Sequence, residues 1–184
     1  ALCGGLSALR RLRRNLDARQ LGLKLLANVT YGYTSASFSG RMPCQPLADA
    51  IVSLGRETLR RAIATVHEGA YSDFLGARVV YGDTDSLFIE VPGATRAQAF
   101  KVGRAIAERV TQHEPHPVEL EFEKLYHPCV LVTKKRYAGL AWRSEASPRG
   151  EYEVKGLESV RRDSCPAVAK ALDRSLQSFF ESGG

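Results

Sequence analysis

Cysteine and histidine are scarce in this sequence, and neither is spaced to bind a metal. The four cysteines lie far apart and form no C-x-x-C pair. This pattern argues against a disulfide framework or a zinc site and is typical of reduced thiols in an intracellular protein. The four histidines have no ligand spacing to those cysteines. The sequence therefore predicts no zinc centre.

Long apolar runs are also lacking. No stretch approaches the length needed to span a bilayer, and the N-terminus has no charged-then-apolar signal pattern, so we expect no contact with a membrane. Internal repeats and low-complexity tracts are absent from the sequence. The chain begins with Ala1 instead of Met and ends at Gly183-Gly184, so we expect it to be part of a longer protein.

The composition is that of an ordinary soluble globular protein. Of the 184 residues, 44% are hydrophobic and 25% are charged, which is enough for one domain with a core. The formal net charge is +6, which weakly favours a polyanionic partner. Its distribution says more, because arginines crowd residues 10–19 and a second basic cluster occupies Lys134 to Arg136.

Hydrophobic periodicity predicts an α+β fold. Apolar residues recur at helical spacing in four segments, at 8–33, 47–67, 95–111 and 166–180. Short stretches suited to strands lie between them, at 77–81, 87–91, 118–123, 129–133, 138–142 and 152–155. We expect Pro128 to break the pairing before the strand at 129–133.

The most informative stretch is Tyr81 to Ser86 (YGDTDS), between two strand-like runs. It predicts a β-hairpin in which Gly82 and Asp83 supply the turn chemistry, with the carboxylates of Asp83 and Asp85 at its tip. Crowded carboxylates repel each other, and a divalent cation relieves that repulsion. The plain alternative is that aspartate merely suits a tight turn.

The helix at 8–33 carries one continuous polar stripe, and its other side is rich in leucine. The stripe consists of Arg10, Arg13, Asp17, Gln20, Lys24, Asn28 and Tyr31. Lysine, asparagine and tyrosine placed one turn apart would suit a nucleoside triphosphate. A solvent-facing stripe with no ligand is the alternative, although Asn28 and Tyr31 are unusual on such a face.

A second basic segment, Lys134 to Tyr137, follows the hairpin. If it is extended, Lys135 and Tyr137 point to one side of the strand and Lys134 and Arg136 to the other. Lysines also blunt exposed strand edges, which is the alternative explanation for this run.

Together these segments resemble the family B DNA polymerases. The resemblance rests on Lys24 to Gly32 (KLLANVTYG), YGDTDS, Lys134 to Tyr137 (KKRY), Lys155 to Glu158 (KGLE) and Arg161 to Pro166 (RRDSCP), in family order. Val29, where most members have Ser, and the continuation from Tyr33 to Cys44 resemble a translesion branch more than the replicative relatives.

The resemblance implies template-directed nucleotidyl transfer from a dNTP to a primer 3′-hydroxyl. It implies Asp85, with Asp83, as catalytic and metal ligands for two Mg²⁺ ions, and Lys24, Asn28, Tyr31 and Gln20 as nucleotide-binding residues. It also implies contacts to primer-template DNA, made by Lys135, Tyr137, Lys134, Arg136 and Lys155. The expected architecture is a second fingers helix at 1–33, an antiparallel palm sheet with packing helices at 34–156, and a helix that begins the thumb at 157–184.

The resemblance also predicts what lies outside this stretch. The two-metal site needs another aspartate from a motif such as D-x-x-S-L-Y-P, which does not occur here, so we expect these residues alone not to extend a primer. We expect a nuclear protein with accessory subunits, and an iron–sulfur cluster only in a C-terminal part not present here. A replicative polymerase and a non-catalytic DNA-binding module that keeps the fold remain alternatives.

Overall fold

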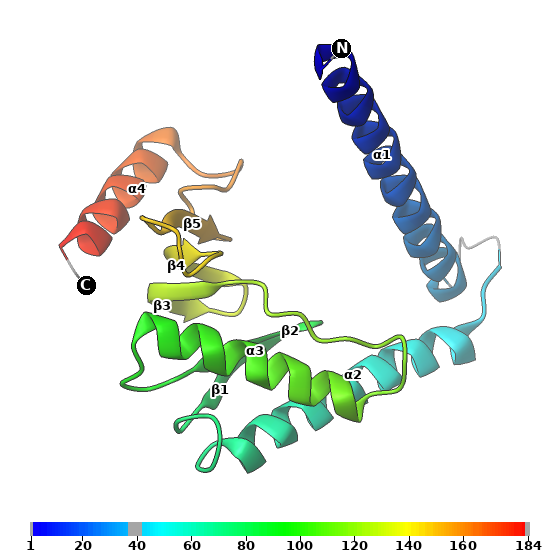
Figure 1. The fold of residues 1–184 in the computed structure, drawn as a ribbon, viewed down its shortest axis with the longest axis horizontal. Helices are drawn as coiled ribbons and strands as arrows, with labels where there is room; N and C mark the ends of the chain where they lie inside the picture. The colour runs from blue at the N-terminus through cyan, green and yellow to red at the C-terminus, as the bar shows by residue number, and fades with distance from the viewer. Residues whose placement is uncertain (1, 37–41, 183–184) are drawn as a thin grey trace. The chain divides into compact units, whose positions relative to one another are not determined.

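The structure is a computed structural model that describes residues 2–36 and 42–182, with side chains from Gly5 onward. It divides into two compact units, Ala1–Glu57 and Thr58–Gly184. The elements, labelled in Figure 1, are α1 (Leu2–Ser35), α2 (Gln45–Gly69), β1 (Arg78–Asp83), β2 (Ser86–Glu90), α3 (Arg96–His113), β3 (Leu125–Thr133), β4 (Arg136–Trp142), β5 (Glu151–Lys155) and α4 (Pro166–Glu181). This confirms the predicted α+β class.

The first unit consists of α1 and the beginning of α2. The predicted amphipathic helix is confirmed and runs longer than predicted, and its leucine side remains exposed within this unit. Residues 37–41, inside the stretch that resembled the translesion branch, lie outside the described residues. No helix in the described part of the chain is long and apolar enough to cross a membrane.

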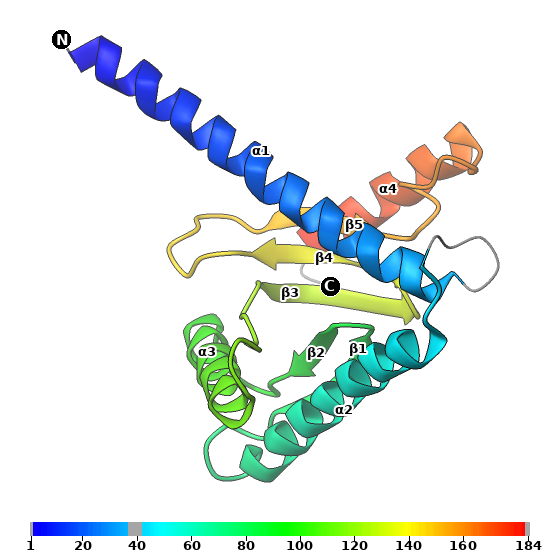
Figure 2. The ribbon, with the colours of Figure 1, turned by 90° about the vertical axis from the view of Figure 1, so that its right-hand side faces the viewer.

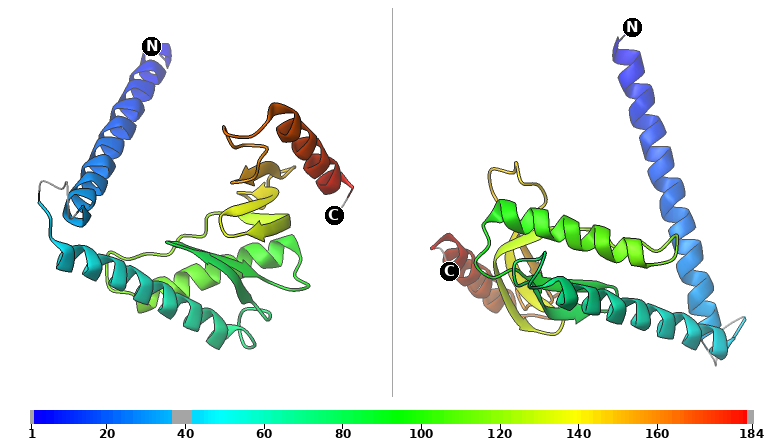
Figure 3. Two further views of the ribbon diagram at one scale, coloured as in Figure 1. Left: turned by 180° about the vertical axis from the view of Figure 1, so that it is seen from behind. Right: turned by 60° about the horizontal axis from the view of Figure 1, so that its bottom comes forward.

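The second unit has a core between helices and the first hairpin. Val66 on the last turns of α2 packs with Phe74 and with Ile106 of α3, and all three side chains are almost fully buried. Figure 3 shows α3 alongside the end of α2, with the β1–β2 hairpin beside them. A capping box starts α3, where Thr95 and Gln98 exchange hydrogen bonds with each other's backbone.

The strands form two antiparallel sheets, β1–β2 and β3–β4–β5. Figure 2 shows β3, β4 and β5 side by side. One face of this sheet packs against α4, where Ala138, Leu157 and Phe180 are buried together. The opposite face of the sheet carries Tyr137, which contacts Phe88 of the first hairpin. Each face of the three-stranded sheet therefore contacts another element.

The predicted strand at 118–123 is wrong, because residues 118–124 contain no regular secondary structure. The alternation of Leu120 and Phe122 reflects packing onto α3 instead. Leu120 exchanges backbone hydrogen bonds with the Thr111 hydroxyl, and the Phe122 ring lies 5.4 Å from the Phe100 ring, measured between centroids. An extended segment that lies on a helix shows the same period of two as a strand.

The expected break at Pro128 is only partly correct. Strand β3 continues through Pro128, but its register against β4 shifts between Tyr126 and Cys129. Proline cannot donate to the ladder, and a bulge accommodates it without ending the strand. The predicted division into residues 1–33, 34–156 and 157–184 stays a prediction.

Candidate active site

The tip of the β1–β2 hairpin presents two carboxylates, as predicted. Asp83 is the last residue of β1 and pairs with Ser86, so the turn residues are Thr84 and Asp85. The prediction that Gly82 and Asp83 form the turn is therefore wrong, because both still belong to the strand. Thr84 has a positive φ of 29° and donates to Asp83 Oδ1 at 3.2 Å. The tight turn thus places both carboxylates, which are two positions apart in the sequence, at the end of the hairpin.

The chemistry of this tip fits magnesium but offers only part of a site. Carboxylate oxygens are the hard donors that Mg²⁺ takes, usually together with substrate phosphates and water. Among residues 2–36 and 42–182, however, no group of three or more His, Cys, Asp or Glu side chains could hold a metal ion. Asp83 and Asp85 would thus supply only part of a metal site and leave its other positions to substrate phosphates, water or residues outside the described ones.

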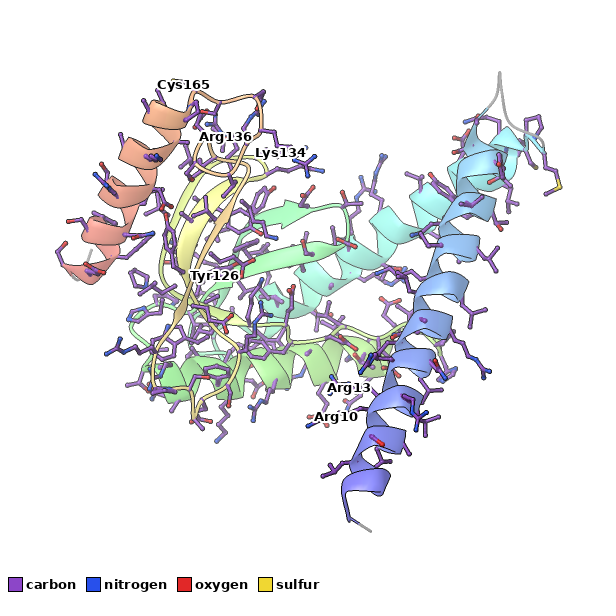
Figure 4. All side chains as sticks on the ribbon, turned by 90° about the horizontal axis from the view of Figure 1, so that it is seen from above. Arg10, Arg13, Tyr126, Lys134, Arg136 and Cys165 are labelled. Carbon is purple, nitrogen blue, oxygen red and sulfur yellow. The ribbon has the colours of Figure 1, made fainter. Side chains whose placement is uncertain are left out.

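The basic run forms the turn between β3 and β4. Thr133 pairs with Arg136, so Lys134 and Lys135 are turn residues, and Lys135 has a φ of +63°. The predicted alternation of this run is wrong, because its first two residues are not extended. Figure 4 shows Lys134 and Arg136 near each other at this end of the hairpin. Arg136 forms an ion pair with Glu158, whereas both lysines are exposed.

The structure brings this basic turn to the acidic hairpin. The ammonium Nζ of Lys135 lies 3.4 Å from Asp83 Oδ1. The backbone N–H of Lys135 donates to the hydroxyl of Tyr81, with 2.7 Å between the N and O atoms. The Asp83 side chain is 26% exposed and that of Lys135 is 65% exposed. Two predicted site groups from different sheets are therefore neighbours.

Tyr137 joins an aromatic cluster between the two sheets. The centroid of the Phe88 ring lies 5.5 Å from that of Tyr81, 5.8 Å from that of Tyr126 and 5.0 Å from that of Tyr137. Burial raises the pKa of Tyr137, so its phenol remains a proton donor at neutral pH. The ring position of this predicted DNA contact is thus set by packing with the acidic β1–β2 hairpin.

Lys155, the last predicted DNA contact, pairs with Tyr137 across β4 and β5. Its Nζ lies 3.7 Å from Glu153 Oε1, and its side chain is 57% exposed. Lys155 therefore lies on the strand next to the basic turn, with its charge accessible to solvent.

The predicted nucleotide-binding residues lie on α1, in the first unit. Lys24 and Asn28 are exposed, and Tyr31 is 38% exposed. Gln20 is likewise exposed on the same stripe. Figure 4 labels Arg10 and Arg13 on this helix. The Nε atom of Arg13 lies 3.8 Å from Oδ2 of Asp17, which is one helical turn further along. Nucleotide binding by this stripe stays a prediction.

Sequence reasoning missed an ion pair beneath the aromatic cluster. Lys124 Nζ lies 2.8 Å from Glu153 Oε1, and these side chains are only 11% and 17% exposed. Burial would raise the pKa of Glu153, but the hydrogen bond and charge of Lys124 outweigh it, so that pKa is lowered. The pKa of Tyr126 is raised by burial and by the Glu153 charge. Lys124 and Glu153 are 29 positions apart, and no local pattern in the sequence indicates that they pair.

Comparison with known proteins gives a consistent answer. The family model described as DNA polymerase family B matches residues 7–183. The human DNA polymerase zeta catalytic subunit is 58% identical over 173 residues, which are 94% of this chain and 5% of that protein. The Saccharomyces cerevisiae zeta subunit is 53% identical over 93% of this chain and 11% of that protein.

A more distant relative has a different name. The bovine DNA polymerase delta catalytic subunit is 42% identical over 170 residues, which are 90% of this chain and 15% of that protein. The chain thus spans a small part of the length of each of these relatives. Because the family model matches nearly the whole chain, the chain belongs to DNA polymerase family B.

Proposed function

We propose that this chain is part of a DNA polymerase that transfers a nucleotide from a dNTP to a primer 3′-hydroxyl under the direction of a template. The observation that carries the proposal is the contact between Asp83 and Lys135. It brings a carboxylate hairpin suited to metal-bound phosphates next to a turn suited to the primer backbone. Nucleotidyl transfer needs the metal-bound phosphates and the primer strand side by side.

Asp85 and Asp83 serve the reacting phosphates in this proposal. Asp85 lies in the turn and is exposed, so its carboxylate is accessible as a ligand. Bound magnesium would stabilise the charge on the attacking and leaving oxygens as the primer oxygen displaces pyrophosphate from the α-phosphate. The ammonium of Lys24 would hold the triphosphate, with Gln20, Asn28 and Tyr31 along the same helix face.

The remaining predicted residues serve the DNA. Lys134 and Lys135 offer exposed charges to primer phosphates, which position a duplex without reading its sequence. Tyr137 lies behind them in the aromatic cluster, and Lys155 extends the basic surface along β5. Arg136 has a different part, because its ion pair with Glu158 ties the basic turn to the segment after β5.

Translesion synthesis is the branch of this function that we favour. The identity to the human zeta subunit is 58%, against 42% for the bovine delta subunit, and Val29 agrees with that branch. We further propose that the whole protein acts in the nucleus with accessory subunits. Any iron–sulfur cluster would belong to a part of the protein outside this chain.

Primer extension by the full-length protein tests the proposal. We expect magnesium-dependent extension that continues past a template lesion, and we expect Asp85→Asn to lower it about a hundredfold or more. A non-catalytic module would lose nothing on that substitution, and a replicative polymerase would stop at the lesion. The isolated chain should not extend a primer, because its described residues hold no complete metal site. Extension by the isolated chain would contradict that expectation.

A further inference from the structure

An irregularity in β1 decides which way the hairpin tip faces. Val79 pairs with Ile89, but the next pair is Tyr81 with Phe88, so β1 holds one extra residue, Val80. Side chains alternate along a strand, and an extra residue therefore moves all later side chains to the other face. Val79 and Ile89 pack against the helical core, whereas Tyr81 and Phe88 join the aromatic cluster.

The residues beyond this bulge contact Lys135 in two ways. The Tyr81 hydroxyl accepts the backbone N–H of Lys135 at 2.7 Å, and Asp83 Oδ1 lies 3.4 Å from its ammonium. Tyr81 and Asp83 are two positions apart on β1, so they share a face. One face of the strand that ends in the acidic turn thus holds both the main chain and the side chain of Lys135.

The hydroxyl contact has a consequence that the ion pair does not have. A lysine side chain is flexible, and an exposed ion pair gives way readily to a competing phosphate. The hydrogen bond to the main chain would remain when the ammonium turns to another partner. It fixes the turn itself and leaves the charges of Lys134 and Lys135 available.

We propose that Tyr81 is a positioning residue for primer binding. Its hydroxyl holds the Lys134–Lys135 turn at a set place relative to Asp83 and Asp85, so that primer phosphates bound by the turn reach the acidic tip. The proposal rests on the proposed function, because it assigns the phosphate ligand of the turn to a primer strand. Tyr81 itself acts through the main chain of Lys135 and contacts no substrate.

The decisive variant is Tyr81→Phe in the full-length protein, since it keeps the ring in the aromatic cluster and removes only the hydroxyl. Tyr71→Phe is the matched control, because Tyr71 is 97% exposed. Hydrogen exchange of the peptide covering 133–137 should accelerate in Tyr81→Phe and remain unchanged in Tyr71→Phe. Loss of one hydrogen bond should raise the KM for primed template about threefold to tenfold, with kcat nearly unchanged.

A second comparison separates positioning from general destabilisation. In a Lys134→Ala/Lys135→Ala background the turn has no ammonium groups to position, so adding Tyr81→Phe should not raise the KM for primed template further. An additive increase in the KM for primed template would overturn the proposal. So would a Tyr81→Phe variant in which this KM and the hydrogen exchange of residues 133–137 are both unchanged. Wild-type protein that binds no primed template would instead overturn the proposed function itself.

Discussion

The Nζ atom of Lys135, in the turn between β3 and β4, lies 3.4 Å from Oδ1 of Asp83, the last residue of β1. This ion pair predicts different effects for the two hairpin aspartates. Asp85→Asn should lower primer extension about a hundredfold or more, since metal stabilisation contributes several kcal/mol. Asp83→Asn should cost less activity and should tighten DNA binding by up to about fivefold, because Lys135 loses its competing carboxylate.

Extension assays and DNA titrations at low salt measure both effects in the full-length protein. Asp163→Asn is the control for removing an exposed, ion-paired carboxylate, because Arg161 binds that group. Weaker DNA binding by Asp83→Asn would show that the ion pair does not compete with DNA for Lys135.

Gly156 permits a close approach between the end of β5 and the basic turn. Its φ is +65°, and a Cβ there would lie 2.2 Å from the carbonyl oxygen of Lys135. Gly156→Ala should therefore lower the free energy of unfolding by about 2 kcal/mol, because both strain and overlap arise. Urea unfolding followed by the fluorescence of Trp142, the single tryptophan, measures this change.

Gly55 supplies the matched control for that substitution. It lies in α2, and a Cβ there would meet nothing within 4 Å. Alanine favours a helix over glycine, so Gly55→Ala should raise helix stability by about 0.5–1 kcal/mol. Equal effects of the two substitutions would contradict the steric argument at Gly156.

The Lys124–Glu153 pair makes stability depend on pH. The pKa of Glu153 is lowered in the folded chain, since Lys124 outweighs the burial of that carboxylate. Its contribution is thus present above the ordinary glutamate pKa of about 4.3 and is lost as the pH falls through the lowered pKa. Lys124→Met should cost about 3 kcal/mol or less at pH 7, because Lys155 and Arg143 remain near Glu153.

The same variant should reverse the pH trend of this group. Without Lys124, burial favours the neutral form of Glu153, so acid should narrow the stability gap between the variant and the wild type. Urea unfolding of both proteins between about pH 4 and pH 7 measures this difference in the free energy of unfolding. Lys124→Met/Glu153→Leu removes both charges and should recover much of the loss. A gap that is constant across this pH range would argue against a coupled pair.

Two cysteines should differ sharply in reactivity. Cys165 precedes α4, where the backbone N–H groups of Val168 and Ala167 lower its thiol pKa. Burial raises the pKa of Cys129 to about 11. At neutral pH, iodoacetamide should alkylate Cys165 at least about a hundredfold faster, because the thiolate is the reacting form. Peptide mass spectrometry gives both rates, and comparable rates would contradict the assignment.

Much of this architecture is encoded locally and was predictable. The four helices follow from apolar residues at helical spacing, and the acidic hairpin follows from Tyr81–Ser86 between two strand-like runs. The candidate site residues were found from motif resemblance, and the chemistry of Asp85 and Lys135 was evident from residue type. These features depend on neighbours within a few positions, so the sequence alone determines them.

The contacts between segments were decided by tertiary structure. The bulge at Val80 turns Tyr81 towards Lys135, although the sequence around Val80 does not indicate a bulge. Residues 118–124 alternate like a strand but find a helix surface instead of a partner strand. Register and pairing depend on which surfaces meet, and those surfaces come from residues far apart in the chain.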